Sequence, residues 1–102
     1  MDGSFKVKVE NKSGLVTVRM MLSHPMESGR RKGQDGKLVP AHYIETLTCD
    51  KGATNLLTAF WGPAIAKDPY LSFQFRNAKP GEQITLRWVD NLGMQGEKNI
   101  VI

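Results

Sequence analysis

Cysteine is almost absent from this sequence, since Cys49 is the only one among 102 residues. A single thiol excludes a disulfide within the chain, so in an oxidising compartment it stays free or pairs with another chain. A buried, inert thiol is the more common fate of such a residue. The only cysteine therefore predicts no structural cross-link and does not by itself indicate redox chemistry.

Long apolar runs are also absent. No stretch approaches the roughly 18 apolar residues that a membrane-spanning helix needs. The first residues, MDGSFKVKVEN, contain no apolar core of a signal peptide. Taken alone, these absences predict a cytoplasmic protein.

Acidic residues are too few to balance the basic ones, since 14 Lys and Arg face 10 Asp and Glu and the net charge is +4. Most of the excess lies in Lys6, Lys8 and Lys12 and in the cluster from Arg30 to Lys32. This charge suits an acidic partner but falls short of the broad basic face typical of nucleic-acid-binding domains. With 102 residues, of which 40% are hydrophobic, the chain predicts one domain over residues 1–102 with a single core.

The sequence does contain short alternating stretches. Apolar and charged residues alternate over residues 5–10. Over residues 16–22, Val16, Val18, Met20 and Leu22 alternate with Thr17, Arg19 and Met21, and the turn at 11–14 joins the two stretches into a predicted hairpin. Met21 interrupts the polar side of the second stretch and marks either a bulge or a face that another surface covers. Further strands are predicted at residues 43–49, 55–61, 71–76, 84–88 and 98–102.

Details of the later stretches give finer expectations. In the strand at 43–49 we expect Ile44, Thr46 and Thr48 on one side, and Tyr43, Leu47 and Cys49 on the other. Residues 64–68 can form a single helical turn, and Pro80-Gly81 fits the centre of a type II turn. Seven short strands without a convincing helix predict an all-β fold, an immunoglobulin-like antiparallel β-sandwich of about seven strands. The paired cysteines of true immunoglobulin domains are missing.

The longest stretch without a regular period is HPMESGRRKGQDGKLVPAH, from His24 to His42. A connection of this length in a small domain is usually functional or disordered. Apolar residues such as Met26 and Leu38 argue against disorder. The alternative to a functional role is a long surface loop without a function of its own. His24 and His42 stand at its two ends, so they approach each other if the excursion closes on itself.

No active site is visible. No Gly-rich loop leads into a helix, and no pair of carboxylates is spaced for acid and base work. One alternative function is a small periplasmic copper-binding protein that uses His24, Met26, His42 and Cys49, although the short ligand spacings of metal motifs are absent. A histidine before proline is more often a hydrogen-bonded structural residue. A third possibility is a carbohydrate-binding sandwich that uses two tryptophans, Trp61 and Trp88, which are more commonly core or interface residues.

Two segments of the sequence are distinctive: MLSHPMESGRRKGQDGKLVPAHYI, residues 21–44, and WGPAIAKDPYLSFQF, residues 61–75. Both resemble the SoxZ family, the Z subunit of the bacterial thiosulfate-oxidation carrier. The run Trp88-Val89-Asp90-Asn91 also fits the C-terminal part of the family. The resemblance covers nearly the whole chain and implies an immunoglobulin-like sandwich without enzymatic activity, cofactor or bound metal.

The resemblance also implies the partners. SoxZ proteins pair with a SoxY-type subunit, whose Gly-rich C-terminal arm bears the cysteine that carries thiosulfate and its oxidation products. This heterodimer passes among a cytochrome c complex, a thiosulfohydrolase and a sulfane dehydrogenase, with no role for nucleic acid or membrane. The present chain ends in EKNIVI without Gly-Cys-Gly, so the substrate cysteine is expected on the partner.

The expected location changes with the resemblance. A SoxY-type subunit has a twin-arginine export signal, and that route moves folded cargo. A partner without its own signal can therefore reach the periplasm by co-export, which replaces the cytoplasmic prediction.

The expected site is a surface for the partner. Around Met21 and Phe60 the sequence has more apolar residues than a strand with one buried face needs. The cluster from Arg30 to Lys32 can face incoming enzymes or the anionic thiosulfonate. Three adjacent charges are also typical of a solvated loop tip. The predicted partner interface consists of Met20, Met21, Leu22, His24, Met26, Arg30, Arg31, His42, Phe60 and Trp61.

Overall fold

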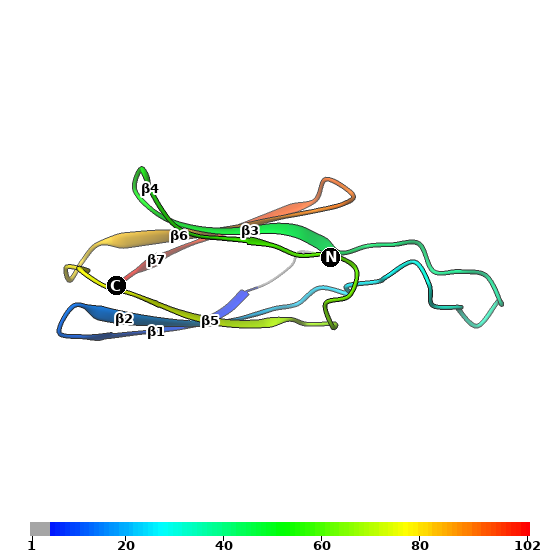
Figure 1. The fold of residues 1–102 in the computed structure, drawn as a ribbon, viewed down its shortest axis with the longest axis horizontal. Helices are drawn as coiled ribbons and strands as arrows, with labels where there is room; N and C mark the ends of the chain where they lie inside the picture. Colours follow the sequence, from blue (N-terminus) through cyan, green and yellow to red (C-terminus); the bar gives the residue numbers. More distant parts are fainter. Residues whose placement is uncertain (1–4) are drawn as a thin grey trace.

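Two antiparallel sheets stack face to face in the protein (Figure 1). The computed structural model describes residues 5–102, so the first part of the segment expected to lack a signal peptide lies outside the described residues. The predicted all-β, immunoglobulin-like antiparallel sandwich of about seven strands is confirmed. The strands are β1 (Phe5–Lys12), β2 (Leu15–Leu22), β3 (Ile44–Lys51), β4 (Thr54–Phe60), β5 (Tyr70–Phe75), β6 (Gln83–Asp90) and β7 (Gln95–Val101).

The alternating pattern of the sequence decides which side chains fill the space between the sheets. One sheet has the strand order β1-β2-β5 and the other β4-β3-β6-β7. From β2 and β6, the central apolar residues point inward and are buried because successive strand residues face opposite sides. The buried apolar side chains are those of Val16, Val18, Met20, Leu22, Met26, Ile44, Leu47, Cys49, Ala78, Ile84, Leu86 and Trp88.

The turns follow local chemistry. β1 and β2 pair from Phe5 opposite Leu22 to Lys12 opposite Leu15, which confirms the predicted hairpin. Its two-residue loop, Ser13-Gly14, has φ of 54° and 88°, as a type I′ turn requires. The predicted type II turn agrees with the structure, because the Glu82 N–H donates to the Lys79 carbonyl at 3.2 Å and Gly81 has φ of 88°.

Strand β3 departs from the expected facing of its side chains. The pairing with β6 shifts register between Ile44 and Thr46, and Ile44 is buried together with Leu47 and Cys49. A bulge adds one residue and so moves the following positions to the other face. The prediction that Ile44 shares a side with Thr46 is therefore wrong.

The expectation of a single helical turn at residues 64–68 is wrong, because these residues form turns and bends. Among the described residues, no helix is long and apolar enough to cross a membrane.

Met21 keeps regular pairing, opposite Lys6 on β1 and Tyr70 on β5, so it marks an exposed face and not a bulge.

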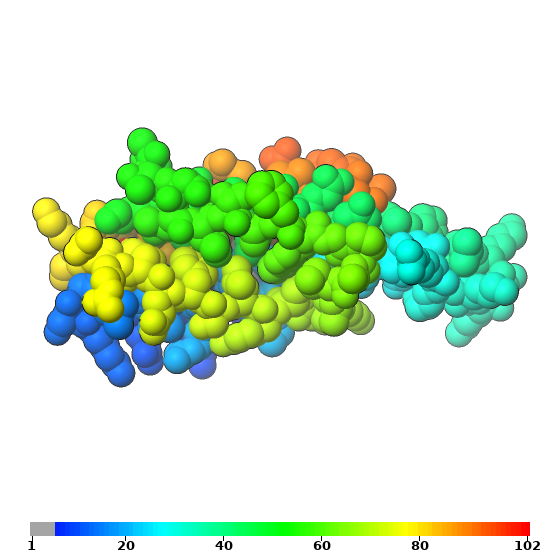
Figure 2. Space-filling model, in the orientation of Figure 1, coloured from blue at the N-terminus to red at the C-terminus, as the bar shows by residue number. Residues whose placement is uncertain are grey.

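Residues 23–43 form an arm that projects from one end of the sandwich (Figures 1 and 2). The arm folds back on itself: Glu27 and His42 exchange two backbone hydrogen bonds of 2.6 and 2.9 Å, and the Val39 N–H donates to the Arg31 carbonyl at 2.7 Å. The molecule measures 54 × 22 × 19 Å, with a radius of gyration of 15.5 Å. A compact domain of this length has a radius of about 13 Å, so the arm accounts for the elongated shape.

Candidate functional site

The root of the arm is closed by two histidines and one aspartate. Nε2 of His24 lies 3.1 Å from Oδ2 of Asp90, and Nε2 of His42 lies 2.7 Å from the same oxygen. The two imidazole rings meet edge to face with centroids 4.6 Å apart. The two ends of the excursion therefore do meet, as the sequence predicts for an excursion that closes on itself.

Asp90 reaches this position because it continues the inward side of β6. The buried residues Ile84, Leu86 and Trp88 alternate along that strand, and Asp90 is the next residue on the same side. Its other oxygen, Oδ1, accepts the backbone N–H groups of Leu92 at 3.0 Å and Met94 at 2.9 Å. The carboxylate thus accepts two hydrogen bonds at each oxygen.

These hydrogen bonds decide the charge of the buried carboxyl. Burial alone raises the pKa of Asp90, but the hydrogen bonds from His24, His42 and the two backbone N–H groups outweigh it and hold the pKa below its ordinary value. Among the described residues, every buried side-chain nitrogen or oxygen has a hydrogen-bond partner. The cluster is therefore a fully satisfied polar centre inside an apolar end of the sandwich.

The tautomer of His24 follows from its second nitrogen. The Met26 N–H donates to Nδ1 at 3.1 Å, so Nδ1 must be unprotonated and the proton lies on Nε2, which donates to Asp90. Burial lowers the pKa of His24, although the hydrogen bond from its ring to Asp90 opposes this. The His24 ring is therefore held neutral, with both nitrogens in use.

This protonation pattern does not fit a resident metal. The ligand atoms of His24, His42 and Asp90 lie within 4.8 Å of one another, which is a suitable spacing. A metal bound at Nε2 of His24 would, however, displace the proton that this nitrogen carries. The ring would then either hold no proton at all, or carry its proton on Nδ1 and lose the hydrogen bond from the Met26 N–H. The arrangement favours a structural clasp, which we call the His-Asp-His clasp and define as His24, His42 and Asp90.

The set proposed for copper is not assembled. Cys49 pairs with Leu57 and Leu86, five residues along β3 from Ile44, and so lies roughly 16 Å from that end of the strand. The Met26 sulfur accepts the Ile44 N–H at 3.3 Å. Burial raises the pKa of the Cys49 thiol to about 11, which agrees with the inert thiol expected from the sequence.

Two further side chains hold the arm in place. Asn91 accepts the Tyr43 N–H at 2.8 Å and donates to the Ala41 carbonyl at 3.0 Å. Asp68 accepts the His24 N–H at its carboxylate and donates its own N–H to the His24 carbonyl, both at 3.1 Å. Sequence reasoning did not identify Asp68, Asp90 or Asn91 as anchors. The position of Asp90 on the apolar side of a strand was the available signal, since a buried carboxylate needs donors.

The predicted partner interface is divided by the structure. Four of its members, Met20, Leu22, His24 and Met26, are buried in the chain itself. Their side chains are therefore not available on the surface, because inward-facing strand positions and the clasp use them. His42 and Trp61 are partly buried, and the exposed members are Met21, Arg30, Arg31 and Phe60.

Met21 and Phe60 lie on opposite faces of the sandwich. Met21 is on the outer side of β1-β2-β5, because its neighbours Met20 and Leu22 point inward. Phe60 pairs with Thr46, which faces away from the buried Leu47. One flat partner surface cannot cover both residues.

The arm carries fewer available charges than its sequence indicates. Arg31 donates to both carboxylate oxygens of Glu27 at 2.9 to 3.2 Å, in a bidentate pair. This contact lowers the pKa of Glu27. Arg30 and Lys32 are exposed and form no ion pair with any other described residue. Lys37 is exposed and without an ion pair among the described residues in the same way, so Arg30, Lys32 and Lys37 are the cations that the arm offers to a ligand.

Comparisons with known proteins give a family and a fold. A family model described as "Sulphur oxidation protein SoxZ" matches residues 5–101. No curated protein matches the sequence significantly.

Solved structures of similar shape include a superoxide reductase in its oxidised state, with a TM-score of 0.66 and 12% identity over 98% of this chain and 87% of that one. A hypothetical protein from Pyrococcus horikoshii has a TM-score of 0.64 and 15% identity over 99% and 89% of the two chains. A neelaredoxin-type superoxide reductase from Archaeoglobus fulgidus, in the reduced form, has a TM-score of 0.64 and 14% identity over 99% and 88%. At these identities the likeness establishes the sandwich fold alone.

Proposed function

The chain belongs to the SoxZ family, and we propose that it is the non-catalytic subunit of a SoxYZ-type heterodimer that presents cysteine-bound sulfur intermediates to thiosulfate-oxidising enzymes. Membership gives a role in the Sox sulfur-oxidation system and association with SoxY within it, and the family is generally non-catalytic. The division of labour between the two subunits is the finer part of the proposal.

The state of Cys49 is the observation that supports this division. Covalent carriage of sulfur needs a thiolate that the donor can reach. Cys49 is the only cysteine in the sequence, its side chain is 0% exposed, and burial raises its pKa to about 11. The carried sulfur therefore requires a cysteine on another chain.

We propose the outer face of β4-β3-β6-β7 as the surface for the permanent partner. Phe60 is 82% exposed there, and Val101 at the other edge is also exposed. The charges of Arg87 and Glu97 lie 3.0 Å apart and neutralise each other. An exposed aromatic side chain on a face with few unpaired charges is typical of a stable protein interface.

The arm is proposed to form the wall along which the cysteine-bearing segment of the partner lies. Arg30 and Lys32 would then attract the anionic sulfur group or the incoming enzymes. Long-range attraction of this kind mainly affects association rate and its salt dependence. The Arg31 side chain contributes less, because Glu27 holds it.

A labelling experiment tests the division of labour. The chain is co-purified with a SoxY-type subunit, loaded with thiosulfate by the cytochrome c complex, and both intact subunits are weighed by mass spectrometry. We expect the adduct on the partner and none on this chain. A sulfur adduct on Cys49, or turnover of a sulfur compound by the isolated chain, would overturn the proposal.

Charge reversal tests the arm. The double variant R30E/R31E should slow loading by about tenfold at low ionic strength while the heterodimer stays intact on gel filtration. R30E alone leaves the Glu27–Arg31 pair intact and should account for most of this effect. The control R76E makes the same single charge change after β5, remote from the arm, and should load normally. Unchanged loading in R30E would remove this residue from the mechanism.

A second variant tests the interface. Phe60→Asp should weaken the heterodimer by roughly 30-fold, the effect of losing an interface hot spot. Tyr70→Asp replaces another exposed aromatic residue, on the outer face of β1-β2-β5, and is the control, because that face is not part of the proposed heterodimer surface. Equal affinity of F60D and the unmodified chain would place the partner elsewhere.

Proteins of the Sox system are typically periplasmic, and we propose co-export with the partner as the route for this chain. Expressed without its partner, the chain should stay in the cytoplasmic fraction. Recovery from the periplasm in the absence of the partner would refute co-export.

A further inference from the structure

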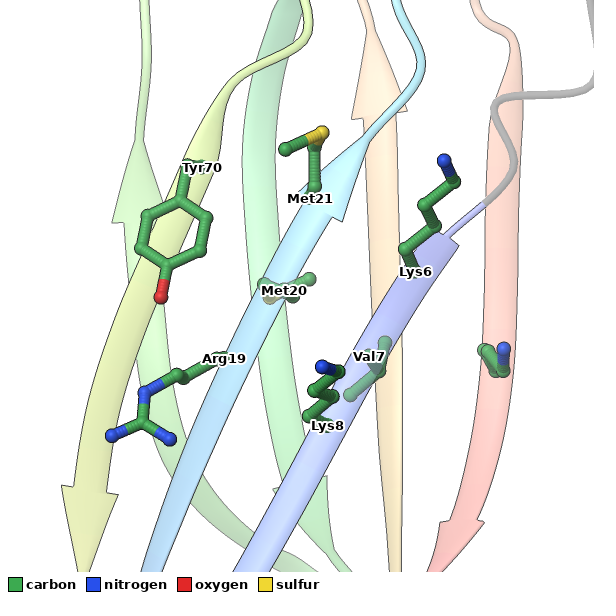
Figure 3. Close-up of a pocket in the computed structure, with 8 residues that line it drawn as sticks. Lys6, Val7, Lys8, Arg19, Met20, Met21 and Tyr70 are labelled. Carbon is green, nitrogen blue, oxygen red and sulfur yellow. The ribbon is translucent and has the colours of Figure 1, made fainter.

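The outer face of β1-β2-β5 carries a groove that differs from the neutral face proposed for the permanent partner. The groove has a volume of about 580 Å³, and its lining includes Lys6, Lys8, Arg19, Met21 and Tyr70 (Figure 3). A fourth cation, Lys98 of β7, also lines it. The groove therefore combines an apolar part with a concentration of positive charge.

Strand register sets this composition. Lys6, Met21 and Tyr70 are direct neighbours across β1, β2 and β5, and the next outward row is Lys8, Arg19 and Ser72. Figure 3 shows Met21 between Tyr70 and Lys6, with Arg19 and Lys8 below them. One row thus offers an apolar contact and the other offers two adjacent cations.

The cationic row is unfavourable for the isolated sheet. Lys8 lies directly opposite Arg19, and like charges in that position destabilise a pair of strands. The carboxylate nearest to Arg19 is Glu10 at 4.0 Å, in a contact where both side chains are about half exposed. Such a surface pair compensates little. An anion placed over Lys8 and Arg19 would relieve the repulsion.

Protection of the sheet edge explains only part of the pattern. Lysines on an edge strand such as β1 prevent edge-to-edge association. Arg19, however, is on β2, the central strand of this sheet. Met21 and Tyr70, which are 42% and 57% exposed, give the face an apolar surface that protection from association does not need.

We infer that this groove binds an acidic polypeptide segment of a transient protein partner, with its carboxylates over Lys6, Lys8 and Arg19 and one aliphatic or aromatic side chain between Met21 and Tyr70. Methionine adapts to varied apolar shapes, and tyrosine offers both an apolar ring and a polar tip. The inference depends on this surface alone and not on the proposed function.

Charge selects this occupant over the others. A second copy of the chain carries the same net charge of +4, so charge repulsion opposes its approach to this cationic face. A nucleic acid needs a longer basic track than two short rows. A membrane surface would engage the charges without a specific apolar contact.

The probe for the test is the synthetic peptide acetyl-EELEFEE-amide, titrated into the isotopically labelled full chain and followed by amide chemical shifts. We expect shifts confined to residues 6–8, 19–21 and 70–72, and an affinity that falls with added salt. K8E should weaken binding about tenfold, and the matched control K12E, at the far end of the same strand and face, should change it less than twofold.

The apolar contact has its own control. The peptide acetyl-EEGESEE-amide has the same charge and should bind at least fivefold more weakly, as should EELEFEE to the variant Met21→Ser. Equal effects of K8E and K12E, equal binding of the two peptides, or stronger binding to vesicles of phosphatidylglycerol than to EELEFEE would overturn the inference. A dispersed amide spectrum in every variant confirms that each remains folded.

Discussion

Replacing Asp90 by Asn should destabilise the protein far more than its small chemical change indicates. An Asn oxygen can still accept the N–H groups of Leu92 and Met94, but its NH₂ group would face the imidazoles that now donate to Oδ2. His42 can change tautomer. His24 cannot, because its Nδ1 accepts the Met26 N–H, so two donors would face each other where both side chains are buried.

The magnitude follows from this geometry. A hydrogen bond to a charged group contributes about 1.5–3 kcal/mol, and a buried unsatisfied donor costs a further 1–3 kcal/mol. We expect a loss of about 3 kcal/mol at neutral pH, or roughly 12–24 °C in melting temperature for a domain of this size. Urea unfolding followed by circular dichroism measures it. The control Asp35→Asn changes an exposed carboxylate that accepts one backbone N–H, from Lys37, and should stay within about 0.5 kcal/mol.

Acid should weaken the same clasp in two stages. The folded-state pKa of His24 lies below the ordinary value of 6.5, so on acidification the unfolded chain binds a proton that the folded chain does not. Stability should therefore begin to fall as the pH drops through about 6.5. The pKa of Asp90 lies below the ordinary value of 3.8, so its contribution is present above that value and is lost below it. A D90N variant as stable as the unmodified chain, or stability that is constant from about pH 7 to 5, would refute the structural clasp.

Further predictions concern the core. Cys49 should react with iodoacetamide at pH 8 only at the rate of unfolding, because it is buried and its pKa is about 11; rapid labelling of the folded chain, measured by mass spectrometry, would contradict its assigned burial. Gly96→Ala should destabilise by about 1–3 kcal/mol, since a Cβ there overlaps the Trp88 indole; an unchanged urea midpoint and Trp fluorescence would show that the indole can move aside. Asn91→Ala should loosen the arm root and speed amide exchange at Tyr43, whose N–H donates to the Asn91 side chain; equal exchange rates in both proteins would count against this anchor.

The burial pattern of most strands could be predicted from the sequence because it depends on neighbours along the chain. Val16, Val18 and Met20 are buried at alternate positions of β2, as a period of two requires. β3 is the exception. Its pairing with β6 contains a bulge between Ile44 and Thr46, and no pattern in the local sequence predicts the position of this bulge or the face on which Ile44 lies.

The sequence by itself determined the family, the all-β class and the positions of the two histidines at the ends of the excursion. Only the tertiary structure decided that Asp90, 48 residues beyond His42, joins them, and that Met21 and Phe60 face opposite ways. The physical reason is the separation along the sequence over which each interaction acts. Strand periods and turn residues act over a few positions, whereas the partners of a buried charge and the outer face of a sheet are set by how the strands pair and the sheets stack.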